Sequence, residues 1–264
     1  MSTTRSIAAL SAAAMALSLA SASNATILAS ANFADYANGP LVGQNGWQQY
    51  NTQSLRPIEV LNGSVNWAGG SLDNAQDAML AFSQQVVQPT EGTTILNFDI
   101  LLSVSSAGTS PSYFAALNTL TTTATSGNFQ NARLVARSSG SGFTFGARVN
   151  GQGGYPFAYG TEELSFGTVY ALRAEIHMVA GNANDFINLY VGSDFSSLTL
   201  HATAAYGSGT VSDPLFGAML LSQFGSASAF ESGVSIQSMS VSLVPAPGAL
   251  ALLAAAGLVG RRRR

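Results

Sequence analysis

Acidic side chains are the first candidates for chemistry in this chain, because cleavage of a glycosidic bond needs two carboxyl groups that flank it. On a strand, residues i and i+2 share a face about 7 Å apart, so a catalytic pair is expected at that spacing. Glu162 and Glu163 are adjacent and would point to opposite faces. Glu175 lies between Arg173 and His177 on one predicted strand face, a pattern typical of a solvated, salt-linked surface. We therefore assign no catalytic residue.

Other catalytic chemistries are excluded by residues that the chain lacks. All ten basic residues are arginine, so no lysine is available to bind nucleotide phosphates or to form a Schiff base. There is no cysteine, which excludes disulfides, thiolate metal sites and cysteine nucleophiles. The only histidines are His177 and His201, and no Gly-x-Ser-x-Gly motif occurs, so a Ser-His-Asp site would need distant assembly. We expect that the protein is not an enzyme.

Calcium is the one metal that the composition permits, because its ligands are carboxylate, amide and carbonyl oxygens. The calcium candidates are Asp73, Asp77 and Asp185, which lie in Asn- and Asp-containing segments predicted to be loops. Neither residues 73–77 nor residues 182–185 have the spacing of an EF-hand calcium loop. Turns stabilised by Asx side chains without a metal are the alternative, and we expect no other cofactor.

Aromatic rings beside amide side chains are the groups that would bind a carbohydrate. The ligand candidates are Trp47, Trp67 and Tyr155, and Tyr50 beside Gln49 is a further one; Gln48 and Asn66 are next to the two tryptophans in the sequence. Most tryptophans in a β-sandwich instead pack in the core or at its rim. Core packing is therefore the alternative for each ring.

The segments that must position these residues show the two-residue period of half-buried strands. Residues 96–104, 143–149 and 170–178 have apolar side chains at every second position, and Gly- and Asn-rich segments such as residues 181–185 separate such runs. Short strands with turns about every 8 to 12 residues favour an all-β fold, an antiparallel two-sheet sandwich or jelly roll. With no linker or repeat to divide them, residues 26–243 are predicted to form one domain.

The N-terminal segment, residues 1–25, has the pattern of a secretory signal peptide. Arg5 precedes a short apolar stretch, residues 7–20, and A-x-A-like sites follow it. We predict cleavage after Ala22 or Ala25. An amphipathic or core helix is the alternative, although the polar residues form no helical stripe.

The C-terminal segment, residues 244–264, combines two prolines, a short apolar run and an arginine cluster. At about 1.5 Å per residue, a helix over residues 249–260 would span about 18 Å, less than the hydrocarbon core of about 30 Å. The arginines would stay on the cytoplasmic side of a membrane, and the prolines would keep the chain before the helix extended. An uncleaved tail anchor is the alternative. The positions that carry the pattern are Val244, Pro245, Ala246, Pro247, Gly248, Arg261, Arg262, Arg263 and Arg264.

This arrangement resembles the PEP-CTERM sorting signal, which membrane exosortases process in Gram-negative bacteria that make extracellular polymers. Ala246 departs from the family pattern, which commonly has Glu between the prolines, and this leaves the subtype of the processing enzyme open. The resemblance implies export by the Sec translocon, transient anchoring of the C-terminal helix in the inner membrane, and processing by an exosortase-type protease. The protein would end at the cell surface or outside the cell.

Three further motifs resemble concanavalin A-like, laminin-G-like jelly-roll domains of secreted bacterial proteins. Residues 33–47 are similar to the opening of these domains, and residues 170–176 with 185–191 are similar to their late hairpin. Residues 234–241 are similar to the last strand, which returns beside the first. The resemblance implies a jelly roll, and another two-sheet sandwich is the alternative.

Removal of both terminal segments would leave five arginines against 13 acidic residues and change the formal net charge from −3 to −8. Such an acidic domain is soluble and is not suited to bind nucleic acid. We expect a non-catalytic exported domain with a structural or carbohydrate-binding role, whose partner would be extracellular polysaccharide. A polysaccharide hydrolase or lyase of the same fold is the alternative.

Overall fold

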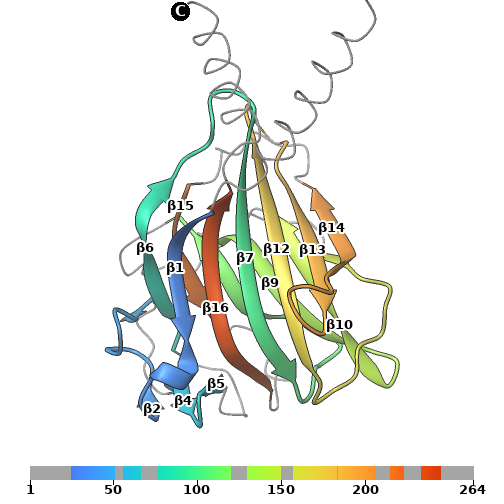
Figure 1. Ribbon diagram of the computed structural model, residues 1–264. Coiled ribbons are helices and arrows are strands. Elements are labelled where there is room, and N and C mark those ends of the chain that lie inside the picture. The colour runs from blue at the N-terminus through green and yellow to red at the C-terminus, as the bar shows by residue number, and fades with distance from the viewer. Residues whose placement is uncertain are drawn as a thin grey trace, which may run out of the picture.

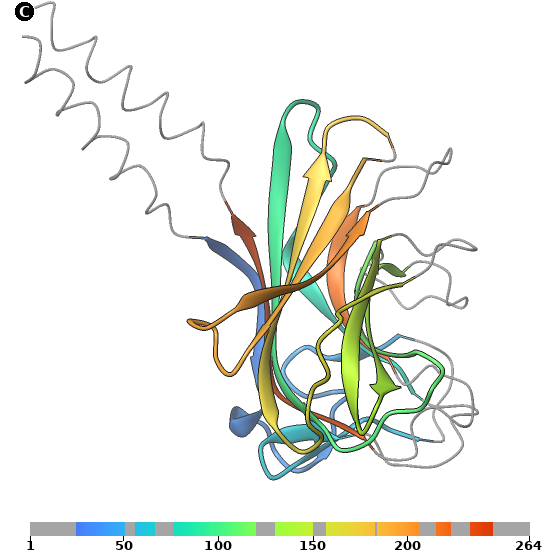
Figure 2. The ribbon, with the colours of Figure 1, turned by 90° about the vertical axis from the view of Figure 1, so that its right-hand side faces the viewer.

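The computed structural model of the chain describes residues 25–50, 56–66, 76–119, 130–149, 157–182, 184–205, 215–222 and 233–244. Within these ranges the chain forms two antiparallel β-sheets that pack on each other, and its helical structure is one 3₁₀ turn, η1 (Phe33–Asp35). Figures 1 and 2 show the two layers from two directions. The predicted all-β, two-sheet fold is confirmed.

The larger sheet has nine strands, and its central strands β16, β7 and β12 lie in front of β9 in Figure 1. The order across it is β14-β13-β12-β7-β16-β5-β4-β2, and β1 also pairs with β16. The strands are β1 (Thr26–Asn32), β2 (Gly39–Pro40), β4 (Glu59–Leu61), β5 (Ser64–Asn66), β7 (Thr93–Val104), β12 (Val169–Val179), β13 (Phe186–Gly192), β14 (Thr199–Ala205) and β16 (Val234–Val244).

The smaller sheet has seven strands in the order β11-β10-β9-β8-β15-β6-β3. Its centre is formed by β8, β9 and β15, and its strands are β3 (Gln48–Gln49), β6 (Ala78–Val86), β8 (Ser112–Asn118), β9 (Gln130–Ser139), β10 (Gly142–Val149), β11 (Ala158–Tyr159) and β15 (Phe216–Leu221).

The strands β7 and β12 confirm the predicted alternation. Every second residue of β7 from Leu96 to Val104 is buried, and so are Leu172, Ala174, Ile176 and Met178 on β12. The two strands pair along their whole length. Their inward side chains meet apolar side chains of the smaller sheet in one continuous core, so burial of apolar area holds the two layers together.

Strand β10 departs from the predicted pattern, because both of its faces are covered. Phe143 and Phe145 point into the core as expected, but Thr144 and Gly146 are buried as well. The ring of Tyr159 lies so close to Gly146 that a Cβ on that glycine would be 2.6 Å from it. The expectation of a wet outer face on this strand is therefore wrong, because a neighbouring ring covers it.

The first and last strands lie side by side, as the resemblance to jelly-roll domains implied. Strand β1 pairs antiparallel with β16, from Thr26 opposite Leu243 to Asn32 opposite Ser238. Strand β16 includes Val244, which the sequence pattern assigned to the C-terminal segment. Residues 1–24 of the predicted signal peptide, and Pro245 onward, lie outside the described residues. No helix in the described ranges is long and apolar enough to cross a membrane.

Candidate functional site

Three arginines lie on the outer face of the smaller sheet. Arg133 and Arg137 belong to β9 and Arg148 to β10. Their strand neighbours, such as Leu134 and Ala147, point into the core, so the arginine side chains point away from it. Arg133 is directly opposite Arg148 in the strand register.

Each of these arginines lies over an aromatic ring. The distances from guanidinium carbon to ring centroid are 4.8 Å for Arg133 over Tyr113, 3.6 Å for Arg137 over Tyr159 and 4.9 Å for Arg148 over Phe157. The three rings also contact one another, because the centroid of Phe157 is 5.5 Å from that of Tyr113 and 6.0 Å from that of Tyr159. We call these six residues the arginine face.

Two cations of the arginine face, Arg133 and Arg148, are directly opposite each other. Like charges directly opposite on neighbouring strands repel each other. Burial, and next the charge of Arg133, lower the pKa of Arg148. Each cation gains only about 0.5–2 kcal/mol from its ring. Guanidinium groups gathered beside aromatic rings are suited to a negatively charged ligand.

A largely apolar cluster adjoins the arginine face on the same side of the sheet. Tyr50 is packed there with residues of β6, β8 and β15 and is 1% exposed. Burial raises the pKa of Tyr50, the Asp77 charge acts in the same direction, and Asn118 and Arg133 oppose it. The phenol therefore stays protonated at neutral pH. The apolar members of the cluster are Met79, Ala116, Ala218 and Leu220.

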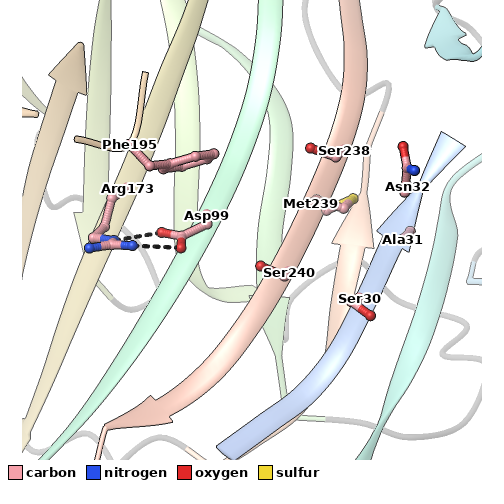
Figure 3. Close-up of a pocket in the computed structure, with 9 residues that line it drawn as sticks. All are labelled: Ser30, Ala31, Asn32, Asp99, Arg173, Phe195, Ser238, Met239 and Ser240. Carbon is pink, nitrogen blue, oxygen red and sulfur yellow. Dashed lines mark hydrogen bonds and ion pairs between the residues drawn. The ribbon is translucent and has the colours of Figure 1, made fainter. Parts of the chain in front are cut away.

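A pocket of about 410 Å³ lies on the opposite side of the molecule, on the outer face of the larger sheet (Figure 3). Arg173 on β12 donates two hydrogen bonds to Asp99 on β7, from Nε to Oδ1 at 2.7 Å and from Nη2 to Oδ2 at 2.8 Å. This bond to Asp99 raises the pKa of Arg173. The other lining residues are Ser30, Ala31, Asn32, Phe195, Ser238, Met239 and Ser240. We call this cavity the hydroxyl pocket.

The sequence-based ligand candidates do not meet in either place. Trp47 is 1% exposed, its ring packs beside Phe33, and its Nε1 donates to the hydroxyl of Tyr36 at 3.2 Å. Trp47 therefore packs in the core, which was the alternative to ligand binding. Trp67 and Tyr155 lie outside the described residues.

The calcium candidates are also dispersed. Asp77 is 9% exposed and adjoins the Tyr50 cluster. Asp185 is 1% exposed, and its Oδ1 accepts hydrogen bonds from the backbone N–H of Val179 at 2.8 Å and from Gln88 Nε2 at 3.2 Å. These bonds fix the turn between β12 and β13. Asp73 lies outside the described residues, in which no group of three or more His, Asp or Glu residues could hold a metal ion.

The salt-linked face expected on β12 has a different pairing and is only partly solvated, because His177 stacks on the ring of Phe186 with the ring centroids 4.1 Å apart. Glu175 accepts a hydrogen bond from His177 at 2.6 Å, whereas Arg173 pairs with Asp99 on the next strand. The sequence analysis did not predict the arginine face. Arg133 and Arg137 are four residues apart, and this even spacing places both on one face of a strand. The spacing is the feature of the sequence that could have indicated the arginine face.

Comparisons with known proteins give the fold. No protein-family model and no curated protein sequence matches the chain. Among solved structures, the CBM2 module of the evolved Dit of Lactobacillus casei BL23 phage J-1 matches with a TM-score of 0.50 and 13% identity, over 83% of this chain and 95% of that one. This likeness shows a shared β-sandwich fold, which is consistent with a jelly roll.

Two other solved structures are less similar. A mutant of the alginate lyase Aly36B in complex with alginate trisaccharide matches with a TM-score of 0.49 and 13% identity, over 84% of this chain and 99% of that one. The exoplasmic/lumenal domain of VIP36 in its Ca²⁺/Man2-bound form has a TM-score of 0.47 and 9% identity, over 84% and 88% of the two chains.

Proposed function

We propose that the protein is an exported, non-catalytic glycan-binding protein, and that its arginine face binds an anionic polysaccharide. The observation that carries the proposal is the distribution of charge. Five arginines lie outside the two terminal segments, and three of them gather on one face, each over a ring. In an acidic chain, this concentration of positive charge favours an acidic ligand.

The chemistry of the face fits a sugar that carries a carboxylate or sulfate. A guanidinium group forms short, charge-assisted and often bidentate hydrogen bonds with such anions. The adjoining rings of Tyr113, Phe157 and Tyr159 offer apolar surface to the C–H groups of sugar rings. The face extends over four strands, β8 to β11. Arg133 is only 7% exposed, whereas Arg137 and Arg148 are half-buried, so the last two are the arginines that a sugar chain would contact.

The test is a binding titration of residues 26–244 with alginate and with the neutral polysaccharide dextran. We expect binding to alginate that weakens as salt is added. Arg137→Gln should lower the affinity about tenfold or more, because a hydrogen bond to a charged group contributes about 1.5–3 kcal/mol. Arg173→Gln removes the same charge from the opposite sheet and should leave alginate binding nearly unchanged.

Equal losses in the two variants would contradict a specific site on the arginine face. The same mixtures also test the hydrolase or lyase alternative. Release of new reducing ends or unsaturated sugars, abolished by a single Glu or Asp substitution, would overturn the non-catalytic assignment.

For sorting, we propose that residues 244–264 are a PEP-CTERM-like signal that an exosortase-type protease reads after Sec export in a Gram-negative bacterium. The support is the sequence pattern of residues 244–264. A cut after Val244 would leave every described strand intact. The mature domain would then reach the cell surface or the extracellular polymer.

Replacing Arg261, Arg262, Arg263 and Arg264 with Ser should leave the protein unprocessed in the inner membrane. Cell fractionation and immunoblotting measure this outcome. Arg137→Gln is the matched control, because it removes an arginine from the domain and should be released normally. Normal release of the four-serine variant would refute the sorting signal.

A further inference from the structure

We infer that the hydroxyl pocket is a second binding site, which takes a neutral sugar chain. It lies on the opposite sheet from the arginine face and does not depend on the function proposed for that face. The inference rests on four features of the pocket, namely its strand register, its ion pair, its aromatic rim and its charge balance.

The polar side chains of the pocket form a row across four strands. In the strand register, Ser30 on β1 is opposite Ser240 on β16, Ser240 is opposite Asp99 on β7, and Asp99 is opposite Arg173 on β12. Neighbouring strands are about 4.8 Å apart, so the row spans about 14 Å. Such a row offers hydrogen-bonding groups to several hydroxyls of an extended sugar chain in succession.

The ion pair at one end of the row is fixed in one plane but retains bonding capacity. The two hydrogen bonds between Arg173 and Asp99 occupy two of the five N–H groups of the guanidinium. The carboxylate of Asp99 can accept further bonds at its remaining lone pairs. The pair thus holds donors and acceptors side by side, which is the pattern that two neighbouring sugar hydroxyls require.

An aromatic ring is held at the rim by a tightly bonded turn. Phe195 is 39% exposed, and its ring centroid is 5.9 Å from the guanidinium carbon of Arg173. Asp194 Oδ1 accepts hydrogen bonds from the backbone N–H of Ser196 at 2.8 Å and from its hydroxyl at 2.6 Å. The turn also packs against Gly192, where a Cβ would be 2.7 Å from the carbonyl oxygen of Ser197.

This turn positions Phe195 in advance of any ligand. The residue is partly covered, with Arg173 beside its ring, and 39% of its surface is left exposed at the edge of the cavity. A ring that borders a polar cavity is the arrangement that stacks on the C–H face of a sugar. Figure 3 shows Phe195 and the Asp99–Arg173 pair together at one end of the pocket, and Asn32, Ser30 and Ala31 at the other.

The charge and size of the pocket indicate a neutral ligand. The only charged lining residues, Asp99 and Arg173, compensate each other, and the rest are Ser, Asn, Ala, Met and Phe. Ala31 and Met239 also line the pocket, but they belong to the core cluster, so the outward side chains of β1 and β16 at the pocket are polar. A volume of about 410 Å³ lies in the range of small-molecule sites.

The experiment is an NMR titration of ¹⁵N-labelled residues 26–244 with cellohexaose and, separately, with mannohexaose. At least one should bind at millimolar concentration and shift the amide signals of Ser30, Ser240 and Phe195. Phe195→Ala should weaken this binding about threefold to tenfold, as the loss of an aromatic contact predicts. Ser240→Ala, which removes one hydroxyl from the row, should also weaken it.

Two control variants make the outcome decisive. Leu200→Ala truncates another exposed apolar side chain, on β14, and should leave binding unchanged. Arg137→Gln should lower the affinity for alginate about tenfold or more without an effect on the neutral oligosaccharide, so the two sites can fail separately. Absence of binding by both oligosaccharides, equal losses in Phe195→Ala and Leu200→Ala, or shifts confined to the arginine face would overturn the inference.

Discussion

His201 links the two sheets through its side chain. It belongs to β14 of the larger sheet, and its Nε2 lies 3.0 Å from the hydroxyl oxygen of Thr144 on β10 of the smaller sheet. That hydroxyl also donates to the carbonyl oxygen of Gly160 at 3.1 Å. Burial lowers the pKa of His201, and the charge of Glu162 opposes this shift. The neutral imidazole is therefore the form that the folded protein favours.

This arrangement predicts that acid weakens the fold at His201. The unfolded chain binds the proton more readily than the folded one, because its histidine pKa is the ordinary value of about 6.5. The stabilising contribution is present above that pH and is lost as the pH falls below it. The free energy of unfolding in urea should decrease between about pH 7.5 and about pH 5. His201→Gln, which cannot be protonated, should show a smaller decrease, and an equal decrease in both proteins would contradict the prediction.

At the scale of elements, β1 is a short strand whose stability depends on one buried face. Its neighbours β16 and β6 contact it, and Leu28 is 3% exposed, whereas the adjacent Ile27 is 63% exposed. The two residues have side chains of equal size on opposite faces of one strand. They are therefore a matched pair for measuring how much the first strand contributes to the core.

Leu28→Ala should lower the free energy of unfolding by about 2–5 kcal/mol, because it removes buried methyl groups and leaves a cavity. Ile27→Ala should change it by about 0.5 kcal/mol or less, as is usual at an exposed site. Urea unfolding followed by circular dichroism measures both values. Similar losses in the two variants would show that β1 does not pack on the core as described.

The strands that the sequence predicted well are those whose two faces have different surroundings. Strands β7 and β12 alternate because one face meets the core and the other carries polar side chains. Strand β15 is buried at all six positions, so no alternation could reveal its orientation. Strand β10 has the same alternation of apolar side chains in its sequence, but nothing in its own residues shows that the ring of Tyr159 covers Gly146.

The two candidate sites depend on register, which the sequence does not carry locally. Arg133 and Arg148 are opposite each other because a tight turn joins β9 to β10, but Tyr113 and Phe157 come from segments on either side of that hairpin. The hydroxyl pocket joins Ser30 to Ser240 across almost the whole chain. Pattern and spacing identify strands, whereas the pairing of distant strands decides which side chains meet.

At the scale of the whole molecule, the charge of the chain is divided between its faces. The arginine face gathers three positive charges with aromatic rings, and the hydroxyl pocket on the other sheet holds one compensated ion pair. The two sites face in opposite directions, because they lie on the outer faces of two stacked sheets. Stacked sheets are about 10 Å apart, so the body of the sandwich separates the two ligands.

A domain with this layout should hold two polysaccharide chains at once. We predict that wild-type protein bound to alginate beads retains cellohexaose or mannohexaose, whichever the free protein binds, and that the oligosaccharide does not displace the protein. Phe195→Ala should stay on the beads and lose the oligosaccharide, because only its hydroxyl pocket is changed. Arg137→Gln should be retained on the beads much less than the wild-type protein, while it still binds the oligosaccharide in solution. Release of the wild-type protein by the neutral oligosaccharide would show that both ligands compete for one site. Retention of both would mean that a single small domain can link acidic and neutral chains of an extracellular polymer.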